Sequence, residues 1–489
     1  MSEYGFWSLV PPLLAIFLAL RTKQVFLSLS IGIWLGWIIL NNGNPLAGTM
    51  DTLAAFVQVF ADPGNTRTII FTLLVGSLIA LIQRSGGVEG FIQWVSRRLE
   101  KSTNTTKSRT MIQLYASLTG MIIFVESNIS ILTVGTLYRP IFDKMKIPRE
   151  KLAYLADSSS APSCIIFPFN AWGAFIMGLL AAQGFDSPFS LLFGSLIYNF
   201  YPFLAIGLVL YIILSGKDFG PMRKAEHRAQ TEGKVIADGA TPMISDEIAM
   251  IEPKSTHNLK AFNMTIPIVV MIAMMPTMLI YTGWDDNNTT PLFQRVFTAI
   301  GNGSGSTSVL YSVTLAILTC MGLYSAQRIM KIKEMIDLSI QGMSGMVSLA
   351  LLMVFAFTIG ALCKELGTGL YIAHATEAWL SPKFVPAIVF VTSCFIAFST
   401  GTSWGTFAIM ISIAVPMAQS MDSNVSMAIA AAIGGGVFGD HCSPISDTTI
   451  ISSMASASDH IDHVNTQLPY ALVAGGATFI LYMIMGSVS

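Results

Sequence analysis

The chain has 489 residues, of which 53% are hydrophobic and 11% are charged. A soluble domain carries about 25% charged residues, so this composition indicates a membrane protein. The formal net charge is −1 and no strongly basic face is present, which argues against nucleic acid as a partner. The cysteines lie at unrelated spacings, a pattern that argues against a disulfide framework or a zinc site. They are Cys164, Cys320, Cys363, Cys394 and Cys442.

A helix that spans a membrane needs about 20 mainly apolar residues. Polar or charged segments separate twelve apolar stretches that are candidates for membrane segments. In chain order these stretches are 6–20, 24–40, 67–83, 111–138, 152–182, 188–214, 261–281, 306–324, 336–363, 384–419, 427–458 and 468–487. The N-terminus lacks the basic segment of a cleaved signal peptide, so the first stretch is predicted to be a span.

The distribution of lysine and arginine predicts the orientation of these segments, because cytoplasmic loops carry an excess of both. Assigning six segments to the cytoplasm places 23 of the 27 Lys and Arg residues there and leaves Arg67, Arg295, Lys364 and Lys383 outside. The cytoplasmic segments are 21–23, 84–109, 139–151, 215–260, 325–335 and 460–465. Both termini are then predicted to lie outside.

This orientation gives two stretches unusual paths. Segment 111–138 has both ends inside and segment 384–419 has both ends outside, so each is predicted to be a re-entrant hairpin. Polar tips, Glu126-Ser127-Asn128 and Ser399-Thr400-Gly401-Thr402-Ser403, interrupt the two apolar runs. Segments 152–182 and 427–458 each cross once and contain polar residues and proline, which predicts broken helices that line a wet cavity.

The two halves of the chain repeat this order with every direction reversed. The prediction is an all-α polytopic membrane protein with two inverted-topology repeats, each of about five spans plus a re-entrant hairpin, with discontinuous helices. Residues 1–214 form the first repeat, 215–260 a cytoplasmic linker and 261–489 the second repeat. Paired broken helices in inverted repeats are typical of secondary transporters, which bind their substrate near the membrane midplane.

Few ionisable side chains lie at membrane depth, and all of them fall at the predicted tip or breaks. An ionisable group there costs at least about 2.5–3.5 kcal/mol, so we interpret these residues as functional. Asp157, Asp440, Asp447 and Glu126 are the predicted cation- and proton-binding residues, with sodium at Asp157, Asp440 and Asp447.

Nearby oxygens and histidines complete the predicted site. Hydroxyl, amide and freed carbonyl oxygens are hard ligands suited to Na⁺. The supporting ligands are predicted to be Ser127, Asn128, Ser160, Thr400, Thr402, Ser443, Ser446 and Thr448, and the pH-sensing candidates are His441, His460 and His463. An alternative is that Asp157 and Asp447 only cap half-helices by accepting hydrogen bonds from backbone N–H groups.

The run Gly439-Asp440-His441-Cys442-Ser443-Pro444-Ile445-Ser446-Asp447-Thr448-Thr449, followed by Asp459-His460-Ile461-Asp462-His463-Val464, resembles the NhaC-type Na⁺/H⁺ antiporter family. The run Asp157-Ser158-Ser159-Ser160-Ala161-Pro162 and the Glu126 tip look like the counterparts in the first half. The resemblance covers nearly the whole chain. It implies the ion-transporter superfamily fold, often a homodimer in a prokaryotic cytoplasmic membrane, and a family that includes malate/lactate exchangers.

Two functions follow as hypotheses. The first is Na⁺/H⁺ antiport by alternating access at a midplane carboxylate and hydroxyl site, without a cofactor and with sodium as the transported or coupling ion. The second is Na⁺- or H⁺-coupled transport of a small organic acid or amino acid, held between the opposing tips and half-helix N-termini. The absence of Lys and Arg at membrane depth weakens this second hypothesis.

An enzyme is not expected. The sequence Val437-Phe438-Gly439-Asp440 lacks the first glycine of the Gly-x-Gly-Asp motif of intramembrane aspartyl proteases, and Asp440, His441 and Ser443 are too close in sequence for a catalytic relay. No Walker loop or nucleotide fingerprint occurs, so the chain is not expected to hydrolyse ATP.

Overall fold

The computed structural model describes residues 4–22, 24–91, 93, 105–124, 126–185, 187–242, 259–286, 291–368, 371 and 381–488. The chain within these ranges is built from helices and contains no strand. In this part of the chain, eight helices are long and apolar enough to cross a membrane, or nine if the bent pair α8 and α9 counts as one span. The predicted all-α polytopic membrane fold is confirmed.

The helices before the linker are α1 (Val10–Thr22), α2 (Val25–Leu40), α3 (Pro45–Gln58), α4 (Pro63–Arg84), α6 (Thr105–Ile122), α7 (Ser127–Lys144), α8 (Arg149–Ile166), α9 (Ala171–Ala182), α10 (Pro188–Ser195) and α11 (Phe200–Ser215). The linker contributes α12 (Gly220–Glu232). The helices after it are α13 (Phe262–Gly283), α14 (Leu292–Asn302), α15 (Gly305–Ala326), α16 (Ile332–Gly345), α17 (Val347–Glu365), α19 (Val385–Thr400), α20 (Ser403–Ser420), α21 (Val425–Cys442), α22 (Asp447–Ser456) and α23 (His460–Val488).

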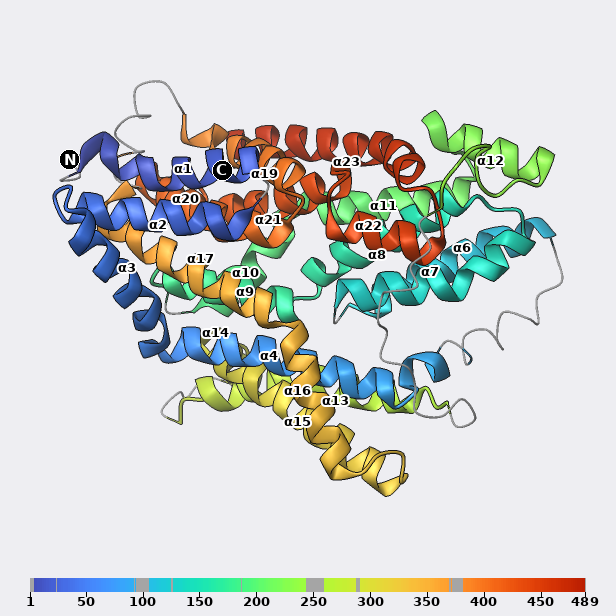
Figure 1. Ribbon diagram of the computed structural model, residues 1–489, viewed down its shortest axis with the longest axis horizontal. Helices are drawn as coiled ribbons and strands as arrows, with labels where there is room; N and C mark the ends of the chain where they lie inside the picture. The colour runs from blue at the N-terminus through green and yellow to red at the C-terminus, as the bar shows by residue number, and fades with distance from the viewer. Residues whose placement is uncertain are drawn as a thin grey trace.

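The long helices run roughly side by side, with α12 at one end of the molecule and the first turns of α1 at the other (Figure 1). Helices α19, α20, α21 and α23 pack together, and α4 packs against α15 and α16 in a separate layer with α13. Both chain ends lie toward the end of the molecule that is away from α12. Which side of the membrane that end faces stays a prediction.

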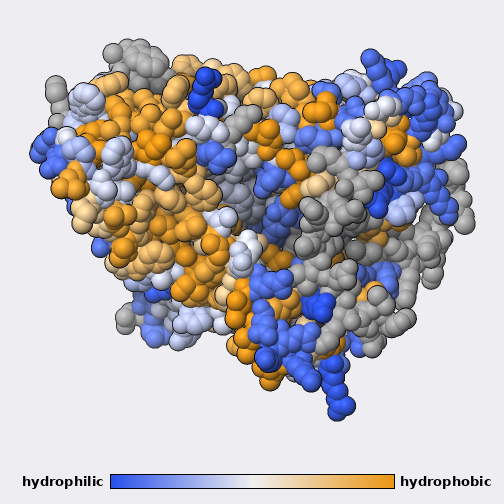
Figure 2. All heavy atoms as spheres, viewed as in Figure 1, coloured by the Kyte–Doolittle hydropathy of each residue, from blue (hydrophilic) through white to orange (hydrophobic). Residues whose placement is uncertain are grey.

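The surface has the character expected of a protein embedded in lipid. Large apolar side chains are exposed on several long helices, among them Leu214 on α11, Val269 on α13 and Phe395 on α19. Figure 2 shows broad hydrophobic areas over the part of the molecule that contains α1, α2 and α17, whereas hydrophilic residues gather near α12. Apolar surface of this extent is stable in contact with lipid tails and unstable in water.

Both predicted hairpins correspond to pairs of consecutive helices in mutual contact, α6 with α7 and α19 with α20. The second tip is a tight turn because Gly401 adopts a left-handed conformation, with φ of +67°, and ends α19. Thr402 then begins α20 by accepting a hydrogen bond from the Gly405 N–H. Whether these tips enter the membrane from opposite sides stays a prediction, as does the division into repeats.

Several elements differ from the helices expected from the apolar runs. Helix α3 lies in a stretch predicted to contain no membrane segment, and its exposed apolar residues, Leu46, Met50, Leu53 and Val57, follow a helical spacing of three and four. The stretch 188–214 is broken near Asn199 into α10 and α11. The stretch 336–363 is divided at Met346 into α16 and α17, without a proline to mark the break.

Helix α12 is held against the membrane helices by ion pairs that the sequence did not predict. The Lys151 ammonium at the start of α8 lies 2.7 Å from an Asp218 carboxylate oxygen, and both side chains are almost fully buried. Arg228 of α12 bonds Glu150 over 2.8 Å, and Arg109 pairs with Glu226. A buried ion pair is strongly destabilised when one partner is lost, so these contacts fix α12 onto the end of α8.

Candidate functional site

The turn of each predicted hairpin contacts a broken helix in the same half of the chain. The α6–α7 turn contacts the break between α8 and α9, and the α19–α20 turn contacts the break between α21 and α22. Asn170, between α8 and α9, donates hydrogen bonds to the carbonyl oxygens of Phe124, Cys164 and Phe167. It thereby ties the α6–α7 turn to the 45° bend between α8 and α9.

In the other half, Gly401 packs so closely on the break between α21 and α22 that a Cβ there would lie 2.5 Å from the Ile445 carbonyl oxygen. A side chain at position 401 would therefore push the α19–α20 turn away from the break.

Asp157 lies in the middle of α8 and is completely buried. Its Oδ2 accepts hydrogen bonds from Gln467 of α23 over 2.6 Å and from Thr449 of α22 over 3.4 Å. Its Oδ1 is buried and has no hydrogen-bond partner. Asp157 therefore joins the first half of the chain to the second, and one of its carboxylate oxygens remains available.

Asp440 lies in the last turn of α21 and is also buried. Its Oδ2 accepts a hydrogen bond of 2.6 Å from Ser403, the first residue of α20, while its Oδ1 has no partner. The Thr449 hydroxyl contacts the Asp440 carbonyl oxygen as well as the Asp157 carboxylate, at 3.4 Å in each case. Thr449 thus lies between the two acidic residues.

Asp447 begins α22 and differs from the other two acids. It interacts electrostatically with Asp157 and Asp440, deep among protein atoms, yet its side chain is exposed. Its carboxylate is therefore accessible to solvent, unlike the buried carboxylates of Asp157 and Asp440.

None of the three aspartates is the N-cap of its helix. Asp157 is in mid-helix and Asp440 is in a C-terminal turn, where a carboxylate faces the negative end of the helix dipole. The N-cap of α22 is Ser446, which accepts a hydrogen bond from the Thr449 N–H, while Asp447 follows it and accepts a hydrogen bond from the adjacent Thr448 N–H. Capping therefore does not account for Asp157 or Asp440.

The Glu126 tip lies in the first half, at the start of α7. Glu126 is half-buried and contacts Ser127, whose hydroxyl lies 3.5 Å from its Oε1, and the buried Asn128 Oδ1 has no hydrogen-bond partner. The hydroxyl of Ser160 on α8 bonds Ser130 of α7 over 2.7 Å. The start of α7 therefore packs against α8, the helix that carries Asp157.

The remaining predicted hydroxyl ligands mostly stabilise backbone. Thr400 donates to Ile396 O, Ser443 donates to Phe398 O, and Thr402 caps α20. Ser446 and Thr448 bond each other over 3.1 Å at the start of α22. Ser403, Thr449 and Gln467 were not predicted to be ligands, yet their side chains hydrogen-bond the buried aspartates.

The histidines separate into two environments. His441 adjoins Asp440 in sequence, but its buried ring bonds the hydroxyl of Tyr201 on α11 over 2.9 Å, and its Nε2 has no partner. His460 and His463 lie at the start of α23, on either side of the Ser453 hydroxyl. No group of three His, Cys, Asp or Glu side chains in the described ranges is close enough to hold a metal ion. The sodium site predicted at Asp157, Asp440 and Asp447 stays a prediction.

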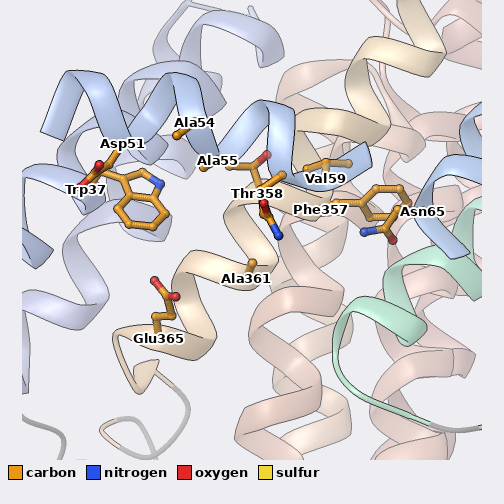
Figure 3. Close-up of a pocket in the computed structure, with 11 residues that line it drawn as sticks. Trp37, Asp51, Ala54, Ala55, Val59, Asn65, Phe357, Thr358, Ala361 and Glu365 are labelled. Atoms are coloured by element: carbon orange, nitrogen blue, oxygen red, sulfur yellow. The ribbon is translucent and has the colours of Figure 1, made fainter. Parts of the chain in front are cut away.

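A separate cavity of about 430 Å³ lies between α3 and α17, at the end of the molecule away from α12 (Figures 1 and 3). Asp51, Glu365 and the Trp37 indole lie at one end of it, and Asn65 and Phe357 lie at the other (Figure 3). Two acidic residues and no Lys or Arg line the cavity, so it attracts cations. Helix α17 also packs against α20, which carries Ser403.

The family of the protein follows from its similarity to known sequences. A model of the Na⁺/H⁺ antiporter family matches residues 174–487, which is well over half of the chain and includes α20, α21 and α22. The chain belongs to the Na⁺/H⁺ antiporter family. This membership confirms the resemblance seen in the Asp440–Thr449 motif and makes the protein an integral membrane transporter.

Individual proteins are similar to the chain over different lengths. An uncharacterized protein of Haemophilus influenzae is 33% identical over 495 residues, which cover 98% of this chain and 91% of that protein. The malate-2H⁺/Na⁺-lactate antiporter of Bacillus subtilis is 27% identical over 162 residues, 32% of this chain and 33% of that protein. The crystal structure of the YdaH transporter of Alcanivorax borkumensis has a TM-score of 0.57 and 13% identity, with 89% of this chain and 88% of that chain covered. At this identity the last likeness shows the transporter's fold alone.

Proposed function

We propose that the transporter exchanges Na⁺ for protons at a site formed by Asp157, Asp440 and Asp447. The observation that carries this proposal is that Oδ1 of Asp157 and Oδ1 of Asp440 are buried without a partner. A buried carboxylate is unstable as an unpaired charge, so it must bind either a cation or a proton. One group that binds either of two cations, but not both together, is the chemical requirement for exchange.

The hydroxyls around these carboxylates supply further ligands for Na⁺. Ser403 and Thr449 already contact the two buried aspartates, and Ser446 lies within hydrogen-bonding reach of Asp440. Asp157 belongs to the first predicted repeat and Asp440 to the second, so movement of one repeat against the other would open the site to alternate sides. We place the transporter in a prokaryotic cytoplasmic membrane, as a homodimer.

The decisive experiment uses the purified full chain in proteoliposomes with a pH-sensitive dye inside. An inward Na⁺ gradient is expected to make the lumen more alkaline, because each entering Na⁺ expels protons. A K⁺ gradient of equal size serves as the ionic control. Absence of any Na⁺-driven pH change, at several internal pH values, would reject Na⁺/H⁺ exchange.

A second function is favoured by the likeness to the malate-2H⁺/Na⁺-lactate antiporter. Here Na⁺ or H⁺ movement is coupled to a small organic acid or amino acid. The same proteoliposomes test it when organic acids and amino acids are added one at a time to the Na⁺ gradient. Stimulation of Na⁺ flux by one solute, together with uptake of that labelled solute, would favour this function over simple exchange.

The predicted orientation can be tested by cysteine labelling in intact cells. Lys234 lies just after α12 with its side chain half-exposed, and Asp286 is exposed after α13. In a cysteine-free background, Asp286→Cys is expected to react with an impermeant maleimide from outside. Lys234→Cys should react only after the cells are permeabilised. Labelling of position 234 in intact cells would contradict the inverted-repeat topology.

The cavity between α3 and α17 is predicted to concentrate Na⁺ near the outer face. Asp51→Asn combined with Glu365→Gln should raise the apparent KM for external Na⁺ by about 2–5-fold at low salt, because it removes two negative charges. The effect should shrink in 0.5 M choline chloride, where the Debye length is shorter than about 8 Å. Asp422→Asn, at another exposed carboxylate on the predicted outer side, is the matched control and should leave KM unchanged.

A further inference from the structure

The cavity between α3 and α17 is separate from the aspartate site, since Asp157, Asp440 and Asp447 do not line it. Its volume of about 430 Å³ lies within the range of roughly 300–1,000 Å³ that is typical of small-molecule pockets. A bare metal cation would leave most of this space unfilled. The cavity therefore has the size of a site for an organic molecule.

Two carboxylates at one end of the cavity lack a cationic partner (Figure 3). Neither Asp51 nor Glu365 forms an ion pair with any residue that the structure describes. Glu365 is the last residue of α17, where a carboxylate faces the negative end of the helix dipole. The neighbouring Lys364 does not line the cavity, and its Nζ lies beside Gly184. A positively charged ligand in the cavity would stabilise both carboxylates.

A hydrogen-bond donor lies at the same end of the cavity. The amide nitrogen of Asn41 donates to the Trp37 carbonyl oxygen over 2.9 Å and to Asp51 Oδ2 over 2.8 Å, so it holds the indole and the carboxylate in one frame. Nε1 of Trp37 is buried and has no acceptor within the described ranges. Figure 3 shows this nitrogen on the side of the ring toward Ala55. A buried N–H without an acceptor is destabilising, so a ligand oxygen would be bound there.

The rest of the cavity wall is mainly apolar. It is formed by Ala54, Ala55 and Val59 before α4 and by Phe357 and Ala361 on α17. Figure 3 shows Phe357 at the end away from the carboxylates. An apolar wall stabilises carbon groups that leave water, but it provides no ligand for a hydrated Na⁺. The cavity thus matches a molecule with a cationic end and an apolar body.

We propose that this cavity binds a primary amine that carries an oxygen next to its ammonium group and an apolar body. The ammonium group donates hydrogen bonds to Asp51 and Glu365, since it has three hydrogens for carboxylate oxygens. The neighbouring oxygen accepts from the Trp37 indole, and the apolar body packs against Phe357. An amino alcohol is the simplest soluble molecule with this chemistry.

Binding can be measured on the full chain purified in a neutral detergent. Tritiated 2-amino-1-phenylethanol is the probe, and equilibrium dialysis is expected to show one saturable site per chain. The neutral analogue 1-phenylpropan-1-ol has a methyl group in place of the ammonium group, so it should bind at least about tenfold more weakly. This comparison uses the wild type and does not depend on the folding of any variant. Equal affinity for the two compounds would overturn the proposal.

Variants assign the contacts. Asp51→Asn combined with Glu365→Gln should weaken binding of the amine by at least about tenfold. Trp37→Phe keeps an aromatic ring but loses the donor, so affinity should fall about threefold for 2-amino-1-phenylethanol and stay unchanged for 2-phenylethylamine, which lacks the hydroxyl. Trp34→Phe is the matched control, because the Trp34 indole on the same helix already donates to Thr49. Unchanged amine affinity in the carboxylate variant would refute the site.

Lipids in the same assay distinguish the source of the amine. The ethanolamine headgroup of a phospholipid has the same chemistry, and the exposed apolar residues Leu53 and Val57 adjoin the lining residues Ala54 and Gln58. Displacement of the probe by phosphatidylethanolamine, but not by phosphatidylglycerol, assigns the site to a lipid headgroup. Displacement by neither lipid assigns it to a soluble amine. Equal displacement by both would show that acyl chains fill the cavity, which contradicts an ammonium site.

Occupancy of the cavity also has a consequence for transport, which rests on the proposed Na⁺/H⁺ exchange. A bound ammonium group offsets one of the two negative charges that attract external Na⁺, so saturating amine should raise the apparent KM for Na⁺ by about twofold. It should have no such effect on the variant that combines Asp51→Asn with Glu365→Gln. An unchanged KM in the wild type would reject this influence, whereas the binding results are readable even if exchange proves wrong.

Discussion

Replacing Asp157 by asparagine is expected to lower Na⁺-driven proton flux by about 10–100-fold, as is the same change at Asp440. The amide keeps the shape of the side chain, and its oxygen can still accept the hydrogen bond from Gln467 or from Ser403. It cannot carry the negative charge or the exchanging proton. Hydrogen bonds to a charged group contribute about 1.5–3 kcal/mol, and each 1.4 kcal/mol corresponds to a factor of ten.

The two asparagine variants should lose activity without losing stability. Both carboxylates are buried with one oxygen unpartnered, so neutralising them removes a desolvation cost. The thermal unfolding temperature of each variant in detergent is therefore expected to equal or exceed that of the wild type. Asp238→Asn, at an exposed residue after α12, should change neither flux nor stability. Near-normal flux in both buried variants would show that these carboxylates are structural.

The sequence predicted the acidic residues of the site because each interrupts an apolar run. Asp157 and Asp440 stand among small, apolar and hydroxyl residues, where a charge has no structural purpose. The same logic predicted the two tips and the broken helices. These predictions could be made because such features are local in the sequence, and because placing them at membrane depth has a large energetic cost.

The partners of the aspartates could not be predicted in this way. Gln467 is 310 positions from Asp157, and Ser403 is 37 positions from Asp440. A hydroxyl or an amide in a membrane helix often bonds the backbone of its own helix, as Ser452 and Thr400 do. Only the packing of α23 on α8, and of α20 on α21, selects which polar side chains face the acids.

Some helix boundaries were predicted wrongly for a different physical reason. The division between α16 and α17 at Met346 follows no proline or charge, only the small residues Gly342, Ser344 and Gly345. Helix α3 was missed because alanine, threonine and glutamine dilute its hydrophobicity, although its exposed stripe is apolar. The summed hydrophobicity of a segment predicts that it lies in the membrane. It does not predict the tilt of the helix, which its packing against neighbouring helices determines.

Competition between Na⁺ and protons for the same carboxylates predicts a large change in apparent Na⁺ affinity with pH. Each proton bound makes the site less negative, so apparent Na⁺ affinity should fall about tenfold per pH unit for each competing proton, over the range in which the carboxylates take up protons. Calorimetric Na⁺ titrations of the purified chain between pH 5 and 9 measure this slope. Asp440→Asn should reduce the slope by about one proton if Asp440 is one of the competing groups.

A coupled solute carrier would behave differently in the same titration. Na⁺ would then tighten binding of the solute, and the solute would tighten Na⁺ binding by an equal factor, as linkage requires. Repeating the titrations with malate, lactate and arginine separates the two mechanisms. A Na⁺ affinity that does not change with pH but rises with one of these solutes would refute exchange. It would instead assign the unpartnered oxygens of Asp157 and Asp440 to a co-transported Na⁺.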